Sequence, residues 1–332
     1  MNPASDIGKR NLPVNIRNRF TEIFVNELDT EEDLIILIKE YLHSLSNISI
    51  DIIKSIVHFY LNLKDEQFLK RLSNGTGTRP TYSLRTLCRA LKNASHNYCN
   101  NSLLSVYDGI CLSFLTDLNR ESSLFLEEYI KENLFKATKS KVLAKILRKK
   151  PKSEHITDQL DFVNIEDYWI LKGPNEPKSN DNSYIFTKSI RENLKRLVRV
   201  CSAQLPCLIQ GDTSIGKTSL IKWLANATGN VLIRINNHDH TDLQEYVGSY
   251  VVEPDGRLVF KEGLLSKAMR KGYWILLDEL NLASSEVLEA LNRVLDDNRE
   301  LYIPETQELI KAHPRFVLFA TQNPPGKVEF YL

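Results

Sequence analysis

The chain has 332 residues, of which 42% are hydrophobic and 26% are charged, and its formal net charge is +1. This length allows about two domains with separate hydrophobic cores, and the near-neutral charge argues against a domain dedicated to nucleic-acid binding. The five scattered cysteines include no Cys-x-x-Cys pair, which favours reduced thiols in an intracellular protein over a disulfide framework or a zinc site.

The first 28 residues open on a polar, basic stretch that lacks the pattern of a secretory signal. No apolar run anywhere in the chain is long enough to span a bilayer, so we expect no membrane segment. Phe20–Val25 alternates in polarity and is rich in β-forming residues, which predicts a strand at the end of this stretch.

Residues 29–118 carry apolar side chains at helical spacing. A pattern that resembles a capping box begins at Thr30, and Ser83 is placed to cap a later helix. The glycine-rich stretch before Pro80 indicates a loop between helices. Together these patterns predict a small helical bundle, whose last helix covers about 106–118.

Residues 119–182 are predicted to form a linker. A basic cluster lies within it, made of Lys145, Arg148, Lys149, Lys150 and Lys152. Such a cluster suits a nuclear localisation signal or a surface for polyanions, but it also suits a solvated linker. The sequence alone favours the solvated linker.

From residue 183 onward, short β-rich runs alternate with helical patterns, as in a parallel sheet covered by helices on both faces. The four runs are 207–210, 231–235, 273–277 and 316–320. Two shorter runs between 251 and 260 flank a Pro-Asp-Gly turn and predict a hairpin. The second half of the chain is therefore predicted to be an α/β unit.

A phosphate-binding motif follows the first of these strands. It has the form Gly-x-x-x-x-Gly-Lys-Thr and consists of Gly211, Asp212, Thr213, Ser214, Ile215, Gly216, Lys217 and Thr218. The strand before it and the helical pattern after it are the required context, because backbone N–H groups at a helix N-terminus attract an anion. We expect Lys217 to reach the β- and γ-phosphates of ATP and Thr218 to ligate Mg²⁺.

Polar residues at the ends of two later strands complete the predicted site. Asp278 and Glu279 end the third run, where we expect Asp278 to hold Mg²⁺ through its water shell and Glu279 to orient and polarise the attacking water. Asn323 follows the fourth strand, and an amide there can bond both the γ-phosphate and the lytic water. His238 and His240 lack a third ligand at suitable spacing, so a polar loop is preferred to a metal site there.

With the phosphate-binding motif, the Asp278-Glu279 pair and Asn323 at the ends of predicted strands, the α/β unit resembles an AAA+ ATPase module. The sequence around these motifs resembles the midasin family of dynein-related AAA+ proteins. The resemblance is clearest in Arg234–His238, Tyr273–Ala283 and Phe319–Gly326. The fold class that this resemblance implies is α/β: a P-loop NTPase (AAA+) parallel sheet flanked by helices, plus an all-α, lid-like helical bundle.

The resemblance also implies how the chain is divided. Residues 1–28 look like the end of a preceding AAA+ core, 29–118 like a lid, 119–182 like a linker, and 183–332 like a nucleotide-binding core truncated before its own arginine finger and lid. An alternative arrangement has the strand at 20–25 pair beside the strand at 207–210 and close a circularly permuted module.

In the family, arginines act on nucleotide held by other modules. By this resemblance Arg17 or Arg19 would serve the module before its own, whereas Arg85 would sense nucleotide on the phosphate loop of its own module, which lies outside this sequence. Neither role completes the site at Lys217, so we expect the chain to bind ATP and Mg²⁺ but to hydrolyse ATP slowly alone.

The function implied by the resemblance is that of an ATP-hydrolysing module in a remodelling motor for 60S pre-ribosome maturation and nuclear export. Its expected partners are the neighbouring AAA+ modules of the same ring, pre-60S particles and assembly factors, in the nucleolus and nucleoplasm. We expect no membrane partner and no direct sequence-specific nucleic-acid binding. The alternative is a hydrolysis-deficient fragment that acts as a nucleotide-binding or structural interaction piece; a phosphotransferase is disfavoured, because Asp278-Glu279 suits water as the nucleophile.

Overall fold

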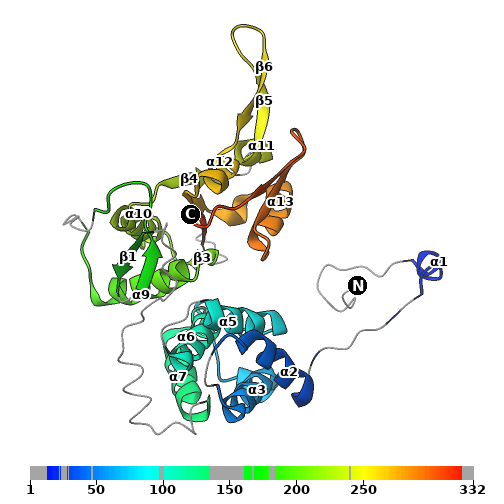
Figure 1. The fold of residues 1–332 in the computed structure, drawn as a ribbon, viewed down its shortest axis with the longest axis vertical. Helices are drawn as coiled ribbons and strands as arrows, with labels where there is room; N and C mark the ends of the chain where they lie inside the picture. The colour runs from blue at the N-terminus through cyan, green and yellow to red at the C-terminus, as the bar shows by residue number, and fades with distance from the viewer. Residues whose placement is uncertain are drawn as a thin grey trace, which may run out of the picture.

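The computed structural model describes residues 13–21, 23, 28, 30–45, 48–96, 101–134, 161–166, 168–178, 184–238 and 241–323. Within these residues the chain forms a helical bundle followed by an α/β domain (Figure 1). A short helix, α1 (Val14–Arg17), lies apart from both (Figure 1). In the part of the chain that is described, no helix is both long and apolar enough to cross a membrane.

The bundle is built from amphipathic helices with side-chain caps at their N-termini. The Thr30, Ser49 and Asn101 side chains accept hydrogen bonds from backbone N–H groups of the first turns of α2, α3 and α6, which satisfies donors that have no partner within the helix. Its helices are α2 (Glu31–Leu42), α3 (Ile50–Lys64), α4 (Glu66–Leu69), α5 (Leu84–His96), α6 (Ser102–Phe114) and α7 (Arg120–Leu134).

The bundle extends past residue 118 and paired strands occupy 162–165 and 168–171, so the prediction of a linker over 119–182 is wrong for both of these parts. Leu126, Ile130 and Leu134 of α7 recur every four residues and are 0%, 0% and 1% exposed in the bundle core. These three residues form a narrow apolar stripe that is flanked by charged and polar residues. Tertiary packing therefore stabilises α7 more than its own sequence pattern does. Residues 135–160, with the basic cluster, lie outside the described residues.

A parallel four-stranded sheet forms the centre of the α/β domain, in the order β3-β10-β7-β4. Its strands are β3 (Cys207–Gln210), β4 (Leu232–Asn236), β7 (Trp274–Asp278) and β10 (Val317–Gln322). These match the four predicted runs, so the predicted α/β unit with a parallel sheet is confirmed.

Helices cover both faces of the sheet, and the central strand β7 shows how. Trp274 and Leu276 face a core that includes residues of α9 (Lys188–Ser202) and α10 (Lys217–Thr228), whereas Ile275 and Leu277 face a core with α12 (Leu264–Lys271) and α13 (Ser285–Leu295). All residues of β7 are buried. A strand covered on both faces has a continuous apolar sequence for this reason.

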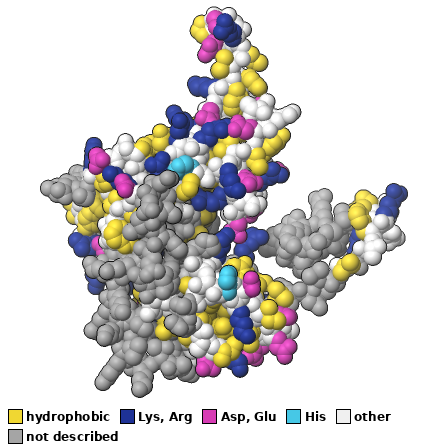
Figure 2. Space-filling view, viewed as in Figure 1, with side chains coloured by type: hydrophobic (Ala, Val, Ile, Leu, Met, Phe, Trp, Pro, Cys, Tyr) yellow, Lys and Arg dark blue, Asp and Glu magenta, His cyan; other side chains and the backbone are white. Residues whose placement is uncertain are grey.

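The described part of the chain also contains three hairpins and two short helical elements outside the four-stranded sheet. The predicted hairpin is confirmed as β5 (Gly248–Val252) and β6 (Leu258–Glu262), which project from the domain and carry hydrophobic side chains toward their tip (Figures 1 and 2). The other hairpins, which the sequence analysis did not predict, pair β1 (Phe162–Ile165) with β2 (Tyr168–Leu171) and β8 (Glu300–Ile303) with β9 (Glu308–Lys311). The remaining short elements are α11 (Leu243–Val247) and the 3-10 helix η1 (Leu280–Leu282).

The prediction of a strand over 20–25 is wrong for the residues of that segment that are described. Phe20, Thr21 and Ile23 are not in a strand, and the Phe20 and Ile23 side chains are 65% and 82% exposed; 22, 24 and 25 lie outside the described residues. A strand needs a neighbour for its backbone hydrogen bonds, and no described segment pairs with this one. Among the described residues β3 pairs only with β10, so the circularly permuted arrangement is not observed.

The bundle contacts the α/β domain through a polar cluster around Asp108 of α6. The Arg199 guanidinium of α9 lies 2.7 Å from the Asp108 carboxylate and also donates to the Asp108 backbone carbonyl at 3.0 Å. The Tyr168 hydroxyl donates to the same carboxylate at 2.9 Å. A second ion pair joins the two units at the surface, between Lys92 of α5 and Asp297 at 2.7 Å.

Replacing Asp108 by alanine is expected to destabilise the protein by about 3 kcal/mol, because a largely buried Arg199 that loses its counterion stays uncompensated. The Asp108 and Arg199 side chains are only 17% and 20% exposed. Asp297→Ala is the matched control, since the Asp297 side chain is 86% exposed and an exposed pair contributes at most about 1 kcal/mol. Urea denaturation followed by circular dichroism would measure both; equal effects would contradict the distinction.

Candidate nucleotide-binding site

The predicted phosphate-binding loop joins β3 to α10. Gly216, the residue before α10, has φ +85°, which residues with a side chain rarely adopt. Ser214 also has a positive φ, +62°. No side chain caps α10, so the first N–H groups of this helix are available to an anion at its positive end.

Lys217 is the first residue of α10, and its ammonium group folds back over the loop. Nζ donates to the Gly211 and Asp212 carbonyl oxygens at 2.5 and 3.1 Å. It also donates to Oδ1 of Asn323 at 2.9 Å. The structure therefore places Asn323, which follows β10, beside the loop lysine. A phosphate oxygen would compete for these same donor hydrogens.

Asp278 lies at the end of β7 and accepts hydrogen bonds on both carboxylate oxygens. Oδ1 accepts from the Thr321 hydroxyl, and Oδ2 accepts from the Thr218 hydroxyl at 3.2 Å. Oδ2 also accepts from Nε and Nη2 of Arg234 at 2.9 and 2.6 Å. Burial raises the pKa of Asp278, but the hydrogen bonds from Thr321, Arg234 and Thr218 outweigh it and hold the pKa below the ordinary value.

The donor set beside the loop fits Mg²⁺. Thr218 and Asp278 offer a hydroxyl and an ionised carboxylate, and Mg²⁺ prefers such oxygen ligands. Their oxygens lie 3.2 Å apart, close to the ~3 Å between neighbouring ligands of an octahedron with bonds of about 2.1 Å. In the described part of the chain, no group of three or more His, Cys, Asp or Glu side chains forms a separate metal centre.

Glu279 follows Asp278 in a strained backbone conformation. Its φ is +52°, in the left-handed region that costs a residue with a side chain roughly 1–2 kcal/mol. Its N–H donates to the Thr321 hydroxyl oxygen at 3.0 Å. Among the described residues its carboxylate has no recorded hydrogen bond or ion pair. Backbone strain of this kind is typical of active sites and ligand-binding sites.

The structure does not gather every predicted residue at the loop. Arg17 and Arg19 lie in and beside α1, away from the α/β domain (Figure 1), and Arg85 lies on the exposed side of α5. Their roles toward another module stay predictions. The backbone N–H of His238 donates to the Thr241 hydroxyl, which suits the predicted polar loop, while His240 is outside the described residues.

Some residues around Asp278 were missed by the sequence analysis. Arg234 and Thr321 bond its carboxylate, and the Asn237 side chain donates to its backbone carbonyl at 2.8 Å. Tyr246 in turn donates to Asn237 at 2.5 Å. Their positions in the sequence could have indicated Arg234, Thr321 and Asn237. Arg234 is a charged residue inside the apolar strand β4, and the other two lie at the carboxyl ends of parallel strands, where ligands bind.

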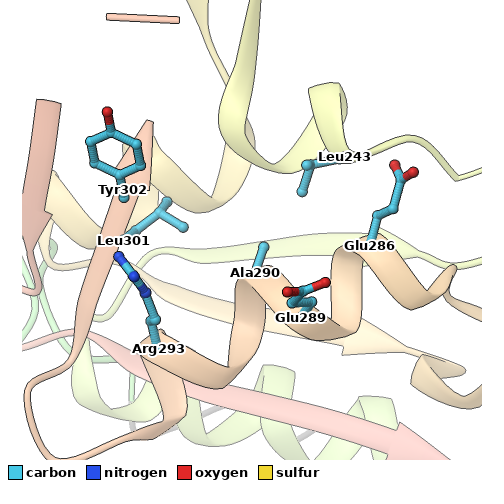
Figure 3. Close-up of a pocket in the computed structure, with 7 residues that line it drawn as sticks. All are labelled: Leu243, Glu286, Glu289, Ala290, Arg293, Leu301 and Tyr302. Atoms are coloured by element: carbon cyan, nitrogen blue, oxygen red, sulfur yellow. The ribbon is translucent and has the colours of Figure 1, made fainter. Parts of the chain in front are cut away.

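A separate hollow of about 380 Å³ lies between α13, β8 and the start of α11 (Figure 3). Its lining residues are Leu243, Glu286, Glu289, Ala290, Arg293, Leu301 and Tyr302. None of the loop residues lines it, so the hollow is distinct from the nucleotide-binding site.

Two parts of the chain match known protein families. Residues 33–137 match the midasin AAA lid domain, and residues 206–331 match the AAA domain of the dynein-related subfamily. The lid match extends beyond residue 118, in agreement with the position of α7. The chain thus has an AAA lid domain followed by an AAA domain of the ATPase superfamily.

The particular likeness is to midasin. The chain is 48% identical to midasin of Dictyostelium discoideum and 41% identical to midasin of Giardia intestinalis, in each case over 98% of its own length. It spans only 6% and 7% of the length of these relatives. NorQ of Paracoccus denitrificans is 36% identical over 120 residues, which are 36% of this chain and 44% of that protein. The predicted resemblance to the midasin family is therefore confirmed.

Proposed function

We propose that this chain is an ATP-binding and ATP-hydrolysing module of a midasin-like remodelling motor. The observation that carries the proposal is the convergence of Lys217, Asn323, Thr218 and Asp278 through hydrogen bonds at the carboxyl edge of the sheet. Lys217 and Thr218 open the helix that follows β3, Asn323 follows β10, and Asp278 ends β7. All of them lie within the segment that matches the AAA domain. The region outside the carboxyl ends of parallel strands is where ligands bind in open α/β sheets.

Binding follows from the charges that the chain places at the loop. The N–H groups at the start of α10 and the Lys217 ammonium would hold the phosphates of ATP. Thr218 and Asp278 would hold Mg²⁺, which would supply positive charge to the phosphate oxygens. Asn323 would stay within reach of the γ-phosphate, because it already shares a hydrogen bond with Lys217.

Hydrolysis would depend on Glu279. Its backbone N–H donates to the Thr321 hydroxyl oxygen, which holds the Glu279 backbone beside Asp278. An ionised carboxylate there can accept the proton of an attacking water while Asp278 keeps its negative charge. The two adjacent carboxylates would then have separate roles, metal binding and general base catalysis.

We further propose that the module works in a ring with other AAA+ modules and acts on pre-60S ribosomal particles with their assembly factors in the nucleolus and nucleoplasm. The support for this is the similarity to midasin over 98% of the chain. The alternative is a hydrolysis-deficient fragment that acts as a nucleotide-binding or structural interaction piece, and the position of Arg17 and Arg19 away from the loop favours it (Figure 1).

Titration calorimetry with ATP and Mg²⁺, together with an assay of phosphate release, tests this function. The expected result is saturable binding of ATP and a measurable release of phosphate. Binding without any release would favour the alternative. No detectable affinity for ATP or ADP would overturn the proposed function and leave only a structural interaction piece.

A further inference from the structure

We propose that Arg234 competes with Mg²⁺ for Oδ2 of Asp278, and so sets the Mg²⁺ concentration at which the site holds Mg²⁺–nucleotide. This inference rests on the proposed nucleotide-binding function. It assigns Arg234 a positioning role: the guanidinium controls access of the metal to its carboxylate ligand and is not itself a ligand or a reacting group.

Both hydrogen bonds of Arg234 go to one oxygen of Asp278. Nε and Nη2 donate to Oδ2 at 2.9 and 2.6 Å. A guanidinium more commonly divides its two bonds between both oxygens of a carboxylate, but here the Thr321 hydroxyl donates to Oδ1. Arg234 is therefore directed to the oxygen that also faces Thr218.

The Oδ2 atom of Asp278 already accepts three hydrogen bonds. It accepts from Nε and Nη2 of Arg234 and from the Thr218 hydroxyl, whereas a carboxylate oxygen offers about two lone-pair sites. A Mg²⁺ ion, or a Mg²⁺-bound water that donates to this oxygen, must replace one of these donors. Thr218 is the other expected metal ligand, so Arg234 is the group that has to leave.

The two side chains differ in their freedom to move. The Asp278 side chain is 9% exposed and is held by Thr321, while the Arg234 side chain is 55% exposed on the edge strand β4. Among the described residues, the Arg234 guanidinium forms hydrogen bonds and an ion pair with Asp278 alone. Rotation of Arg234 into solvent would thus release Oδ2 without disturbing the core. Because the guanidinium stays charged at all ordinary pH values, it also repels the cation while it remains in place.

A purely structural ion pair makes the opposite prediction. If Arg234 only orients Asp278, its removal would loosen the carboxylate and weaken Mg²⁺ binding. If Arg234 competes with the metal, its removal would strengthen Mg²⁺ binding. The sign of the change in Mg²⁺ affinity therefore separates the two roles.

The experiment measures binding of a fluorescent ADP analogue, first in EDTA and then across a Mg²⁺ titration, for the wild type, Arg234→Gln and Arg234→Lys. We expect Arg234→Gln to lower the midpoint Mg²⁺ concentration by about 5-fold or more, which is about 1 kcal/mol. Affinity in EDTA should stay the same, and Arg234→Lys should shift the midpoint less because it keeps the charge. Arg257→Gln, at an arginine that is 82% exposed in the β5–β6 turn, is the matched control.

An unchanged or raised midpoint in Arg234→Gln, with analogue binding intact in EDTA, would overturn this inference and leave the proposed function standing. Absence of analogue binding by the wild type under every condition would overturn the proposed function and this inference with it. Circular dichroism of each variant checks folding. If Arg234→Gln fails to fold, a midpoint in Arg234→Lys equal to or above that of the wild type is the overturning result.

Discussion

Replacing Lys217 by alanine is expected to lower the affinity for ATP by about 100-fold or more. The ammonium group reaches Gly211, Asp212 and Asn323 in this structure, so it is already positioned over the loop where phosphates would bind. Charge-assisted hydrogen bonds to phosphate are worth about 1.5–3 kcal/mol each, and the loss of two of them accounts for an effect of this size.

Lys222→Ala is the matched control for this prediction. Lys222 belongs to the same helix, α10, but is exposed, so its loss changes the charge of the helix without changing the loop. Calorimetry with ATP and Mg²⁺ measures both variants, and thermal unfolding checks that Lys217→Ala retains its fold. An affinity within a few-fold of the wild type in a folded Lys217→Ala protein would contradict the assignment of the loop.

Replacing Glu279 by glutamine is expected to slow ATP hydrolysis by about 10²–10⁴-fold, the usual contribution of a general base. Glutamine has nearly the same size, so it should tolerate the positive φ of this position as glutamate does, and Asp278 keeps its own partners. Affinity for Mg²⁺–ATP is expected to stay within about 3-fold of the wild type, since the amide removes only the proton acceptor.

Glu286→Gln serves as its control, because Glu286 is an exposed carboxylate at the start of α13, beside the separate hollow. Single-turnover phosphate release would measure the rate, and calorimetry the affinity. A Glu279→Gln protein that releases phosphate at the wild-type rate would show that another group activates the water. A parallel loss of affinity would instead indicate a role for Glu279 in binding.

Sequence patterns were sufficient where structure depends on neighbours along the chain. The motif from Gly211 to Thr218 contains its own turn, glycine and helix start, and the structure places it between β3 and α10. The continuous apolar run of β7 likewise predicted a strand buried on both faces. The isolated alternation at 20–25 failed because a strand also needs a partner, and no described segment supplies one.

The sequence by itself determined the class of this protein, because a phosphate-binding loop and the Asp278-Glu279 pair are contiguous motifs with local causes. Only the tertiary structure decided which residues meet there. The strand order inserts β10 between β3 and β7, which brings Asn323 to Lys217 across 106 residues and brings Arg234 and Thr321 to Asp278. Such contacts depend on how strands are ordered in space, and spacing along the chain carries no direct record of that order.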